Sequence, residues 1–400
     1  MTKSDIIDMA FKVWGRNYYR KTSLTHLACE LKVSKPALYR HFTNKQALTA
    51  AMTERFLDDL SACIRADFEQ AEKNEDADTG IFSIIKSITE FFANNPYALI
   101  FSLMSIYDRD LSGQTILMML KERGADMASL SGVINKKYNN NAILVRLIIA
   151  TLTFHVSFFH KTHNSLKNPL SGDDVQKIIT LINKTIQCGL GYAPEKADLD
   201  FEKIEKQVTE ALPASQTEPF FKAVAEAVAE AGPWDVSMEM VAKKLGLSKS
   251  SLYVHFKNRK DMLRRLFVTE FKRIIAFARK GISLSGDTAQ QLYLGLFSIS
   301  VYLRSRPEIL IAMDWIRTRK LDLGKADKHV EVFRLFEDVN IEPLKNASET
   351  EKQLASHWIL FLLINILINP AEAAGAVSAD SGSIRVLYKF IIMGLGGFIR

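Results

Sequence analysis

The sequence contains one twelve-residue segment twice, and this duplication constrains the fold more than any other feature. "SKPALYRHFTNK" at Ser34–Lys45 returns as "SKSSLYVHFKNR" at Ser248–Arg259, with seven of twelve positions identical at an offset of 214 residues. Two weaker matches follow in the same order. "FFANNPYALI" at Phe91–Ile100 aligns with "YLRSRPEILI" at offset 211, and "TIQCGLGY" at Thr185–Tyr192 aligns with "FIIMGLGG" at offset 205. Three matches in one order predict two full-length copies of one unit.

The 400 residues therefore divide into two units of about 200 residues, each large enough for two domains. Between the units, the polar segment after Tyr192 holds Phe201, Ile204, Val208 and Leu212 at the spacing of one helical face, which predicts a short docked helix. The expected order is a small domain at 1–49, a larger helical domain at 50–192, a linker at 193–214, a second small domain at 215–265 and a second larger one at 266–400.

The apolar periodicity predicts an all-α fold. Lys45–Asn74 has apolar residues at helical spacing, and no convincing strand pattern occurs. Two apolar stretches are interrupted by Arg146 and Asn365, and the second is shorter than the roughly 20 residues that span a membrane. We interpret both as buried helices. Because Asp5 and Asp8 interrupt the N-terminal segment, it does not resemble a signal peptide, and we expect a soluble, cytoplasmic protein.

Each copy of the repeated segment predicts two short helices joined by a tight turn. In the first copy Ser34 is a good N-cap, and Leu38 and Phe42, four residues apart, face the core. This arrangement is a helix-turn-helix. The turn of the second copy contains Gly246, which suits a positive φ, but the first copy has Lys32 there. We expect the first turn to be strained by about 1 kcal/mol or to differ in shape.

The segments "VSKPALYRHFTNKQAL" and "LSKSSLYVHFKNRKDM" resemble the helix-turn-helix signature of tetracycline-repressor-like (TetR family) transcriptional regulators. An amphipathic helix ending at Gly15 or Gly232 precedes each segment, as the resemblance requires. The resemblance implies that the second helix of each pair enters the major groove of double-stranded DNA. The implied DNA-binding residues are Thr22, Ser34, Lys35, Pro36, Ala37, Tyr39, Arg40, His41 and Lys45 in the first copy, and Ser248, Lys249, Ser250, Ser251, Tyr253, Val254, His255 and Arg259 in the second.

The positive charge gathers on the two small domains. Residues 1–49 hold nine Lys/Arg against three Asp/Glu, a charge of +6, and residues 215–265 hold nine against six, a charge of +3. The whole chain carries +7, so the remaining residues sum to 7 − 9 = −2. This distribution favours a nucleic-acid partner for the small domains.

The larger domains resemble the effector-binding and dimerisation domains of that family. An unidentified small-molecule effector is implied, and aromatic residues that are candidates for its pocket are Phe92, Phe101, Tyr107 and Phe158 in the first unit and Phe297, Tyr302 and Trp315 in the second. Aromatic residues at helical spacing also occur in ordinary cores, and this alternative stays open. The last two helices of each unit are the most apolar, and we expect them to pair within one chain as a pseudo-dimer, with a homodimer as the alternative.

Other chemistry has little support in the sequence. His155, His160 and His163 are not spaced to bind one metal ion from one helical face, so we expect no metal site and no cofactor. No nucleophile–base pair or glycine-rich phosphate loop occurs, and we expect no enzymatic activity. The cysteines have no ligand spacing, and we interpret them as buried, reduced thiols.

The resemblance therefore implies a ligand-relieved repressor that binds a quasi-palindromic operator. Arg40 of the first copy corresponds to Val254 of the second, which predicts operator halves that are related but unequal. Two alternatives remain. One is a regulator in which only one of the two helix-turn-helix domains (the readers) binds DNA, and the other is a ligand-binding or protein-interaction module that keeps the fold without binding DNA.

Overall fold

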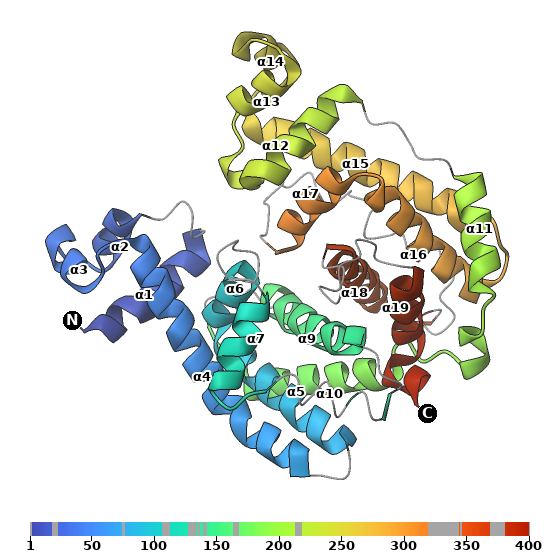
Figure 1. Ribbon diagram of the computed structural model, residues 1–400, viewed down its shortest axis with the longest axis horizontal. Coiled ribbons are helices and arrows are strands. Elements are labelled where there is room, and N and C mark those ends of the chain that lie inside the picture. The colour runs from blue at the N-terminus through green and yellow to red at the C-terminus, as the bar shows by residue number, and fades with distance from the viewer. Residues whose placement is uncertain are drawn as a thin grey trace. The chain divides into compact units, whose positions relative to one another are not determined.

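The computed structural model describes residues 2–17, 23–73, 77–105, 113–126, 142–162, 168–212, 218–318, 346–368 and 381–399, together with Ile134, Lys137, Tyr138 and Leu344. Every regular element in these ranges is helical (Figure 1). The chain is therefore all-α. It forms two compact units, one of residues 1–184 with 399–400 and one of residues 185–398.

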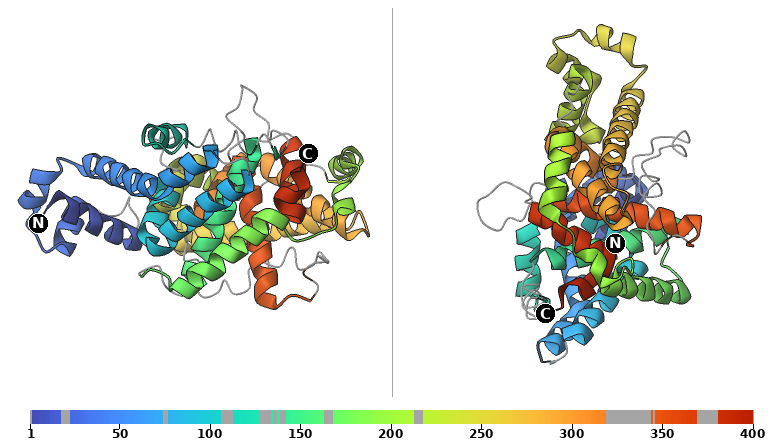
Figure 2. Two further views of the ribbon diagram at one scale, coloured as in Figure 1. Left: turned by 90° about the horizontal axis from the view of Figure 1, so that it is seen from below. Right: turned by 90° about the vertical axis from the view of Figure 1, so that its right-hand side faces the viewer.

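Unit 1 begins with three short helices and a long one. Its helices are α1 (Lys3–Asn17), α2 (Leu24–Glu30), α3 (Lys35–His41), α4 (Lys45–Lys73), α5 (Ala77–Asn94), α6 (Pro96–Ser105), α7 (Gly113–Glu122), α9 (Ala142–Thr162) and α10 (Gly172–Cys188), whose last turn belongs to unit 2. Helix α4 packs against α1 and α5, and α6 packs against α1, α5 and α9. The α2–α3 pair lies at one end of α4 (Figure 2).

Unit 2 repeats the order of α1–α6, α9 and α10 after a short linker, and none of its described helices corresponds to α7. Its elements are η2 (Pro194–Ala197), α11 (Phe201–Ala211), α12 (Pro219–Asp235), α13 (Met238–Leu245), α14 (Lys249–His255), α15 (Arg259–Ile282), α16 (Thr288–Arg304), α17 (Pro307–Thr318), α18 (Glu349–Ile368), α19 (Ser381–Met393) and η6 (Gly394–Phe398). Helix α15 packs against α12 and α16, and α17 packs against α12, α16 and α18. The same neighbours recur in both units, as a duplication predicts.

The linker contains a docked helix, α11, which packs against α16. Its apolar face is buried, with Ile204, Val208 and Leu212 between 0% and 6% exposed. Its polar face is also anchored, because the Glu205 carboxylate accepts hydrogen bonds from the Arg385 guanidinium at 2.7 and 2.9 Å. The Tyr293 hydroxyl donates to the same carboxylate at 2.5 Å. The apolar spacing predicted the helix, but the ion pair joins residues far apart in the chain.

Two apolar helices, α9 and α18, have the length and composition of membrane spans. Within the most apolar window of each, 61% and 56% of the residues are buried inside the protein. Core helices of soluble proteins have the same properties, so these two are weak evidence for a membrane protein.

Three local expectations from the sequence differ from the structure. The cysteines Cys29, Cys63 and Cys188 are free and exposed, not buried, because each lies on the solvent side of its helix. Helix α1 continues past Gly15 to Asn17. Helix α12 breaks at Gly232, where φ is 78°, but a further helical turn follows.

Candidate nucleic-acid interface

The first helix-turn-helix is built by two serine caps and two core anchors. The Ser23 and Ser34 side chains accept hydrogen bonds from the backbone N–H of His26 at 3.1 Å and Ala37 at 3.3 Å, which starts α2 and α3. Leu38 is 0% exposed and Phe42 is 2% exposed, so both hold α3 on the domain core. Thr22, one of the implied DNA-binding residues, lies outside the described residues.

The second helix-turn-helix has the same frame. Ser237 and Ser248 accept from the backbone N–H of Met240 and Ser251, both at 3.1 Å. Leu252 is 0% exposed and Phe256 is 3% exposed, at the positions of Leu38 and Phe42. The second helices of the two pairs, α3 and α14, which are the candidate recognition helices, therefore rest on equivalent supports.

The turns between the paired helices have the same conformation despite their different residues. Lys32 has a φ of 55° and Gly246 a φ of 65°. Among the described residues, Lys32 is the one non-glycine residue with a positive φ. In the first turn the next residue, Val33, donates its N–H to the Ala28 carbonyl at 3.0 Å. In the second turn Leu247 donates to the Ala242 carbonyl at 2.9 Å. Of the two expectations, a strained lysine in the same turn or a turn of different shape, the positive φ of Lys32 supports the first.

The outer faces of the two recognition helices carry the residues that the resemblance implied. Tyr39 is 42% exposed, Tyr253 is 47% exposed and Val254 is 84% exposed. Ala37, Lys45, Ser251 and Arg259 are half-buried, and the exposed members of the set are Ser34, Lys35, Pro36, Arg40, His41, Ser248, Lys249, Ser250 and His255. These side chains can meet a groove without any rearrangement of the core.

Some of these residues also contact their own domain. The Lys35 ammonium lies 5.8 Å from the Tyr39 ring centroid, and the Lys45 ammonium lies 5.9 Å from that of Trp14. In unit 2 the His255 ring lies 5.2 Å from that of Phe220. These contacts restrict the side chains to few rotamers, which lowers the entropic cost of ordering them on a ligand.

The helix after each recognition helix begins with an asparagine cap. The Asn44 side chain accepts from the backbone N–H of Ala47 at 2.7 Å, and the Asn258 side chain accepts from Asp261 at 3.0 Å. The positive ends of the long helices α4 and α15 therefore lie directly after α3 and α14, beside Lys45 and Arg259. Such helix ends favour phosphate groups.

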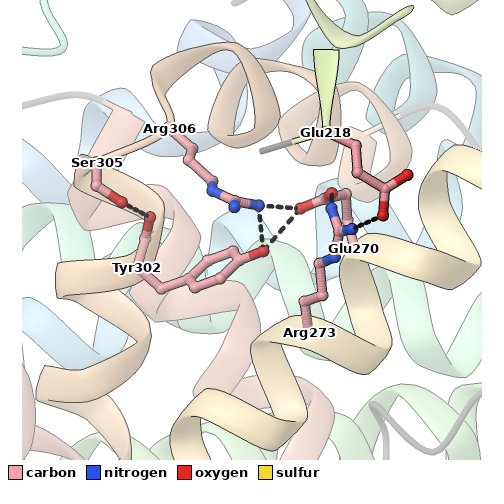
Figure 3. Close-up of polar contacts among 6 residues, drawn as sticks. All are labelled: Glu218, Glu270, Arg273, Tyr302, Ser305 and Arg306. Carbon is pink, nitrogen blue, oxygen red and sulfur yellow. Dashed lines mark hydrogen bonds and ion pairs between the residues drawn. The ribbon is translucent and has the colours of Figure 1, made fainter. Parts of the chain in front are cut away.

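A buried polar network in unit 2 links the second small domain to the larger helical domain (Figure 3). The Glu270 carboxylate accepts from the Tyr302 hydroxyl and from Arg306, both at 2.8 Å, and from Arg273 at 2.9 Å. Arg273 also donates to Glu218, the residue before α12, at 2.7 Å. Glu270 and Arg306 are each 1% exposed. Sequence reasoning missed this network; its one signal was a glutamate between Phe267 and Phe271 on the apolar face of α15.

Unit 1 has phenylalanine at two of the equivalent positions. At the offsets of the repeat, Phe56 corresponds to Glu270 and Phe91 to Tyr302. The Phe56 ring lies 6.2 Å from Phe91, 6.4 Å from Phe92 and 5.9 Å from Phe101, measured between centroids. The same position in the two units therefore lies in an aromatic cluster in unit 1 and in an ionic network in unit 2.

The candidate effector residues occupy different environments. Phe92, Phe101, Phe297 and Tyr302 are buried, and Phe158 is half-buried. Tyr302 is engaged with Glu270, and burial together with that carboxylate raises the pKa of its hydroxyl. Tyr107 lies outside the described residues, as does the side chain of Trp315.

The histidines of α9 bind backbone carbonyls. His155 Nδ1 lies 2.8 Å from the Thr151 oxygen, and His160 Nε2 lies 3.1 Å from the Phe92 oxygen. Burial lowers the pKa of His155 to about 4, so this ring is neutral at pH 7. Within the described part of the chain, no three His, Cys, Asp or Glu side chains gather in a way that would hold a metal ion. His163 lies outside that part.

The two small domains match one family of bacterial proteins. The N-terminal domain of bacterial regulatory proteins of the tetR family matches residues 6–52 and again residues 221–266. The chain therefore contains two TetR-like N-terminal domains in tandem. The matched ranges contain both helix-turn-helix pairs with their N-capping serines.

Two solved structures are similar to parts of this chain. The fatty acid degradation regulator FadR from Bacillus halodurans has 18% sequence identity, with 45% of this chain and 97% of that chain covered and a TM-score of 0.38. The TetR family transcriptional regulator PfmR from Thermus thermophilus has 20% identity, the same two coverages and a TM-score of 0.34.

Proposed function

We propose that this TetR-like regulator is a sequence-specific repressor that binds a quasi-palindromic operator and is released by a small-molecule effector in the cytoplasm. The observation that carries the proposal is the pair of equivalent recognition helices. Each has a serine cap, a buried leucine anchor and an exposed Lys-x-x-x-Tyr face. The local charges of +6 and +3 would attract the phosphate backbone.

One chain would supply both readers as an internal pseudo-dimer. Paired readers on a twofold axis bind half-sites one helical turn apart, or a multiple of it. The apolar helix pairs α9–α10 and α18–α19 are the elements that we propose for the pairing. On this proposal the 45.1 kDa chain sediments as a monomer at concentrations that saturate DNA. An obligate dimer whose DNA affinity collapses on dilution would contradict it.

The two readers would prefer related but different half-sites. Arg40 has a guanidinium that can donate two hydrogen bonds to guanine, whereas Val254 offers apolar contact, such as to a thymine methyl group. Pro36–Ala37 against Ser250–Ser251 is a second difference at the start of the helix. Because the supports of the two helices are equivalent, we assign the difference in half-site preference to these residues.

The effector would bind in one or both of the larger domains. The buried aromatic cluster of Phe56, Phe91, Phe92 and Phe101 supports an apolar ligand in unit 1. In unit 2 the corresponding interior is occupied by the Glu270 network. Unit 1 is therefore the better candidate for an apolar effector.

The DNA-binding part of the proposal is tested by fluorescence anisotropy on random-sequence duplex DNA across a salt series. The logarithm of the binding constant should fall linearly with the logarithm of salt concentration, with a slope of about −0.9 per phosphate contact. Lys35→Ala and Lys249→Ala should each weaken binding and reduce the slope by about 1. Lys86→Ala, an exposed lysine of α5, is the control.

The alternatives predict other outcomes of this experiment. If only Lys35→Ala or only Lys249→Ala changes the slope, one reader alone binds DNA. If the wild-type chain shows no salt-dependent binding, it is a ligand-binding or protein-interaction module and the proposal is wrong.

A further inference from the structure

Unit 2 contains a glycine contact between two segments that correspond to one another in the repeat. Gly189 follows α10 and Gly394 follows α19, and they align at the offset of 205 residues. Their φ angles are 57° and 58°. Both segments lie within Thr185–Phe398, so the contact is internal to one compact unit.

Neither glycine has space for a side chain. A Cβ atom at Gly189 would lie 2.5 Å from the Ile391 oxygen, 2.6 Å from the Gly394 nitrogen and 2.7 Å from the Met393 nitrogen. A Cβ atom at Gly394 would clash with the Ile186 oxygen and would lie 2.7 Å from the Cys188 nitrogen. These neighbours are backbone atoms, which cannot rotate away as a side-chain tip can.

The two sets of neighbours are reciprocal. Gly189 meets Ile391 and Met393, while Gly394 meets Ile186 and Cys188. At the offset of 205, Ile186 corresponds to Ile391 and Cys188 to Met393. When residue i of one element contacts j of the other, and j contacts i in return, the contact has local twofold symmetry.

Backbone hydrogen bonds secure this contact, with donors on the segment after α10 and acceptors on α19. Leu190 donates its N–H to the Ile391 oxygen at 2.8 Å, and Tyr192 donates to the Ile392 oxygen at 3.0 Å. These oxygens belong to the last turn of α19, where carbonyls lack partners within the helix. The Tyr388 hydroxyl also donates to the Lys196 oxygen at 2.8 Å, which fixes the following segment to α19.

We infer that these helix ends form a self-complementary seam, Gly189 against Gly394, between the corresponding ends of the two copies of the repeat. The seam explains why the compact unit that contains α19 begins at Thr185, before the end of α10. It gives a physical basis to the pseudo-dimer of the proposed function, on which it rests. It also requires glycine at both positions, for space and for backbone conformation.

The test measures the distance between the two readers in the full-length chain by double electron–electron resonance. One spin label is placed on Cys29, which is exposed, and one on Lys243→Cys, the exposed residue that corresponds to Cys29 at the offset of 214. Cys63→Ser and Cys188→Ser remove the other thiols. A narrow distance distribution is expected for this parent protein, and Gly189→Ala should at least double its width.

Gly191→Ala is the matched control, because Gly191 also has a positive φ of 79° but has nothing within 4 Å of the position that a Cβ atom would take. It should leave the distribution unchanged, which separates the seam from backbone strain. Gly394→Ala repeats the test from the other side of the seam. Circular dichroism selects the variants that retain parental helix content.

The seam is contradicted if folded Gly189→Ala or Gly394→Ala keeps the parental width, or if Gly191→Ala broadens the distribution as much as Gly189→Ala does. A broad distribution in the parent protein also contradicts it. Because the measurement contains no DNA, failure of the DNA-binding proposal would be seen only in the anisotropy experiment.

Discussion

Lys32 and Gly246 show how much of a single residue's conformation can be predicted from a repeat. The alignment placed a lysine where the other copy has a glycine, and both residues adopt a left-handed backbone. The serine caps at Ser34 and Ser248 were predictable for the same reason, since caps depend on neighbours in sequence. Glu270 and Arg306 were not predictable, because their burial depends on a partner 36 residues away.

The strain at Lys32 predicts an asymmetric response to substitution. Lys32→Gly should stabilise its domain by up to about 1 kcal/mol, and Gly246→Ala should destabilise its domain by about 1 kcal/mol. A Cβ atom at Gly246 would have nothing within 4 Å, so the second effect comes from the backbone alone. Differential scanning calorimetry should record shifts of about 2–4 °C in opposite directions. Shifts of the same sign would show that the turn stores no strain.

At the scale of elements, apolar spacing in the sequence predicts the helices, but it does not predict the polar contacts that hold them in place. The spacing of Ile204, Val208 and Leu212 predicted α11. Its ion pair with Arg385 joins residues 180 positions apart. Burial raises the pKa of the Glu205 carboxyl. The hydrogen bonds from Arg385 and Tyr293 and the charge of Arg385 lower it by more, so the net pKa lies below its ordinary value.

This lowered pKa predicts a pH-dependent stability of α11. Because the folded pKa of Glu205 is below the unfolded one, its contribution is complete at pH 7 and is lost as the pH falls below about 4. At pH 7, Glu205→Gln should cost about 2 kcal/mol, or about 30-fold faster amide exchange in α11. The difference from wild type should shrink towards pH 3, after correction for intrinsic exchange. Glu210→Gln, at an exposed position of α11, is the control; an equal effect there would refute the role of the ion pair.

At the scale of the whole molecule, the duplication was readable in the sequence, while the seam at Gly189 was not. The three matched segments predicted two copies, and the described helices of both units follow the same order apart from α7. The boundary of the compact units falls at Lys184 and Thr185, ahead of the join expected after Tyr192. Reciprocal contacts between Gly189 and Gly394 are a property of three-dimensional packing, and no spacing in the chain encodes them.

The central claim is that one chain reads two related operator halves with two differently tuned helices. Selection of bound duplexes from a random pool by the intact chain tests it most directly. The account predicts two enriched half-sites, separated by one helical turn or a multiple, that are unequal where Arg40 and Val254 would contact the bases. Arg40→Val should relax discrimination in one half only. No enriched sequence, or a perfect palindrome whose symmetry Arg40→Val leaves unchanged, would contradict the account.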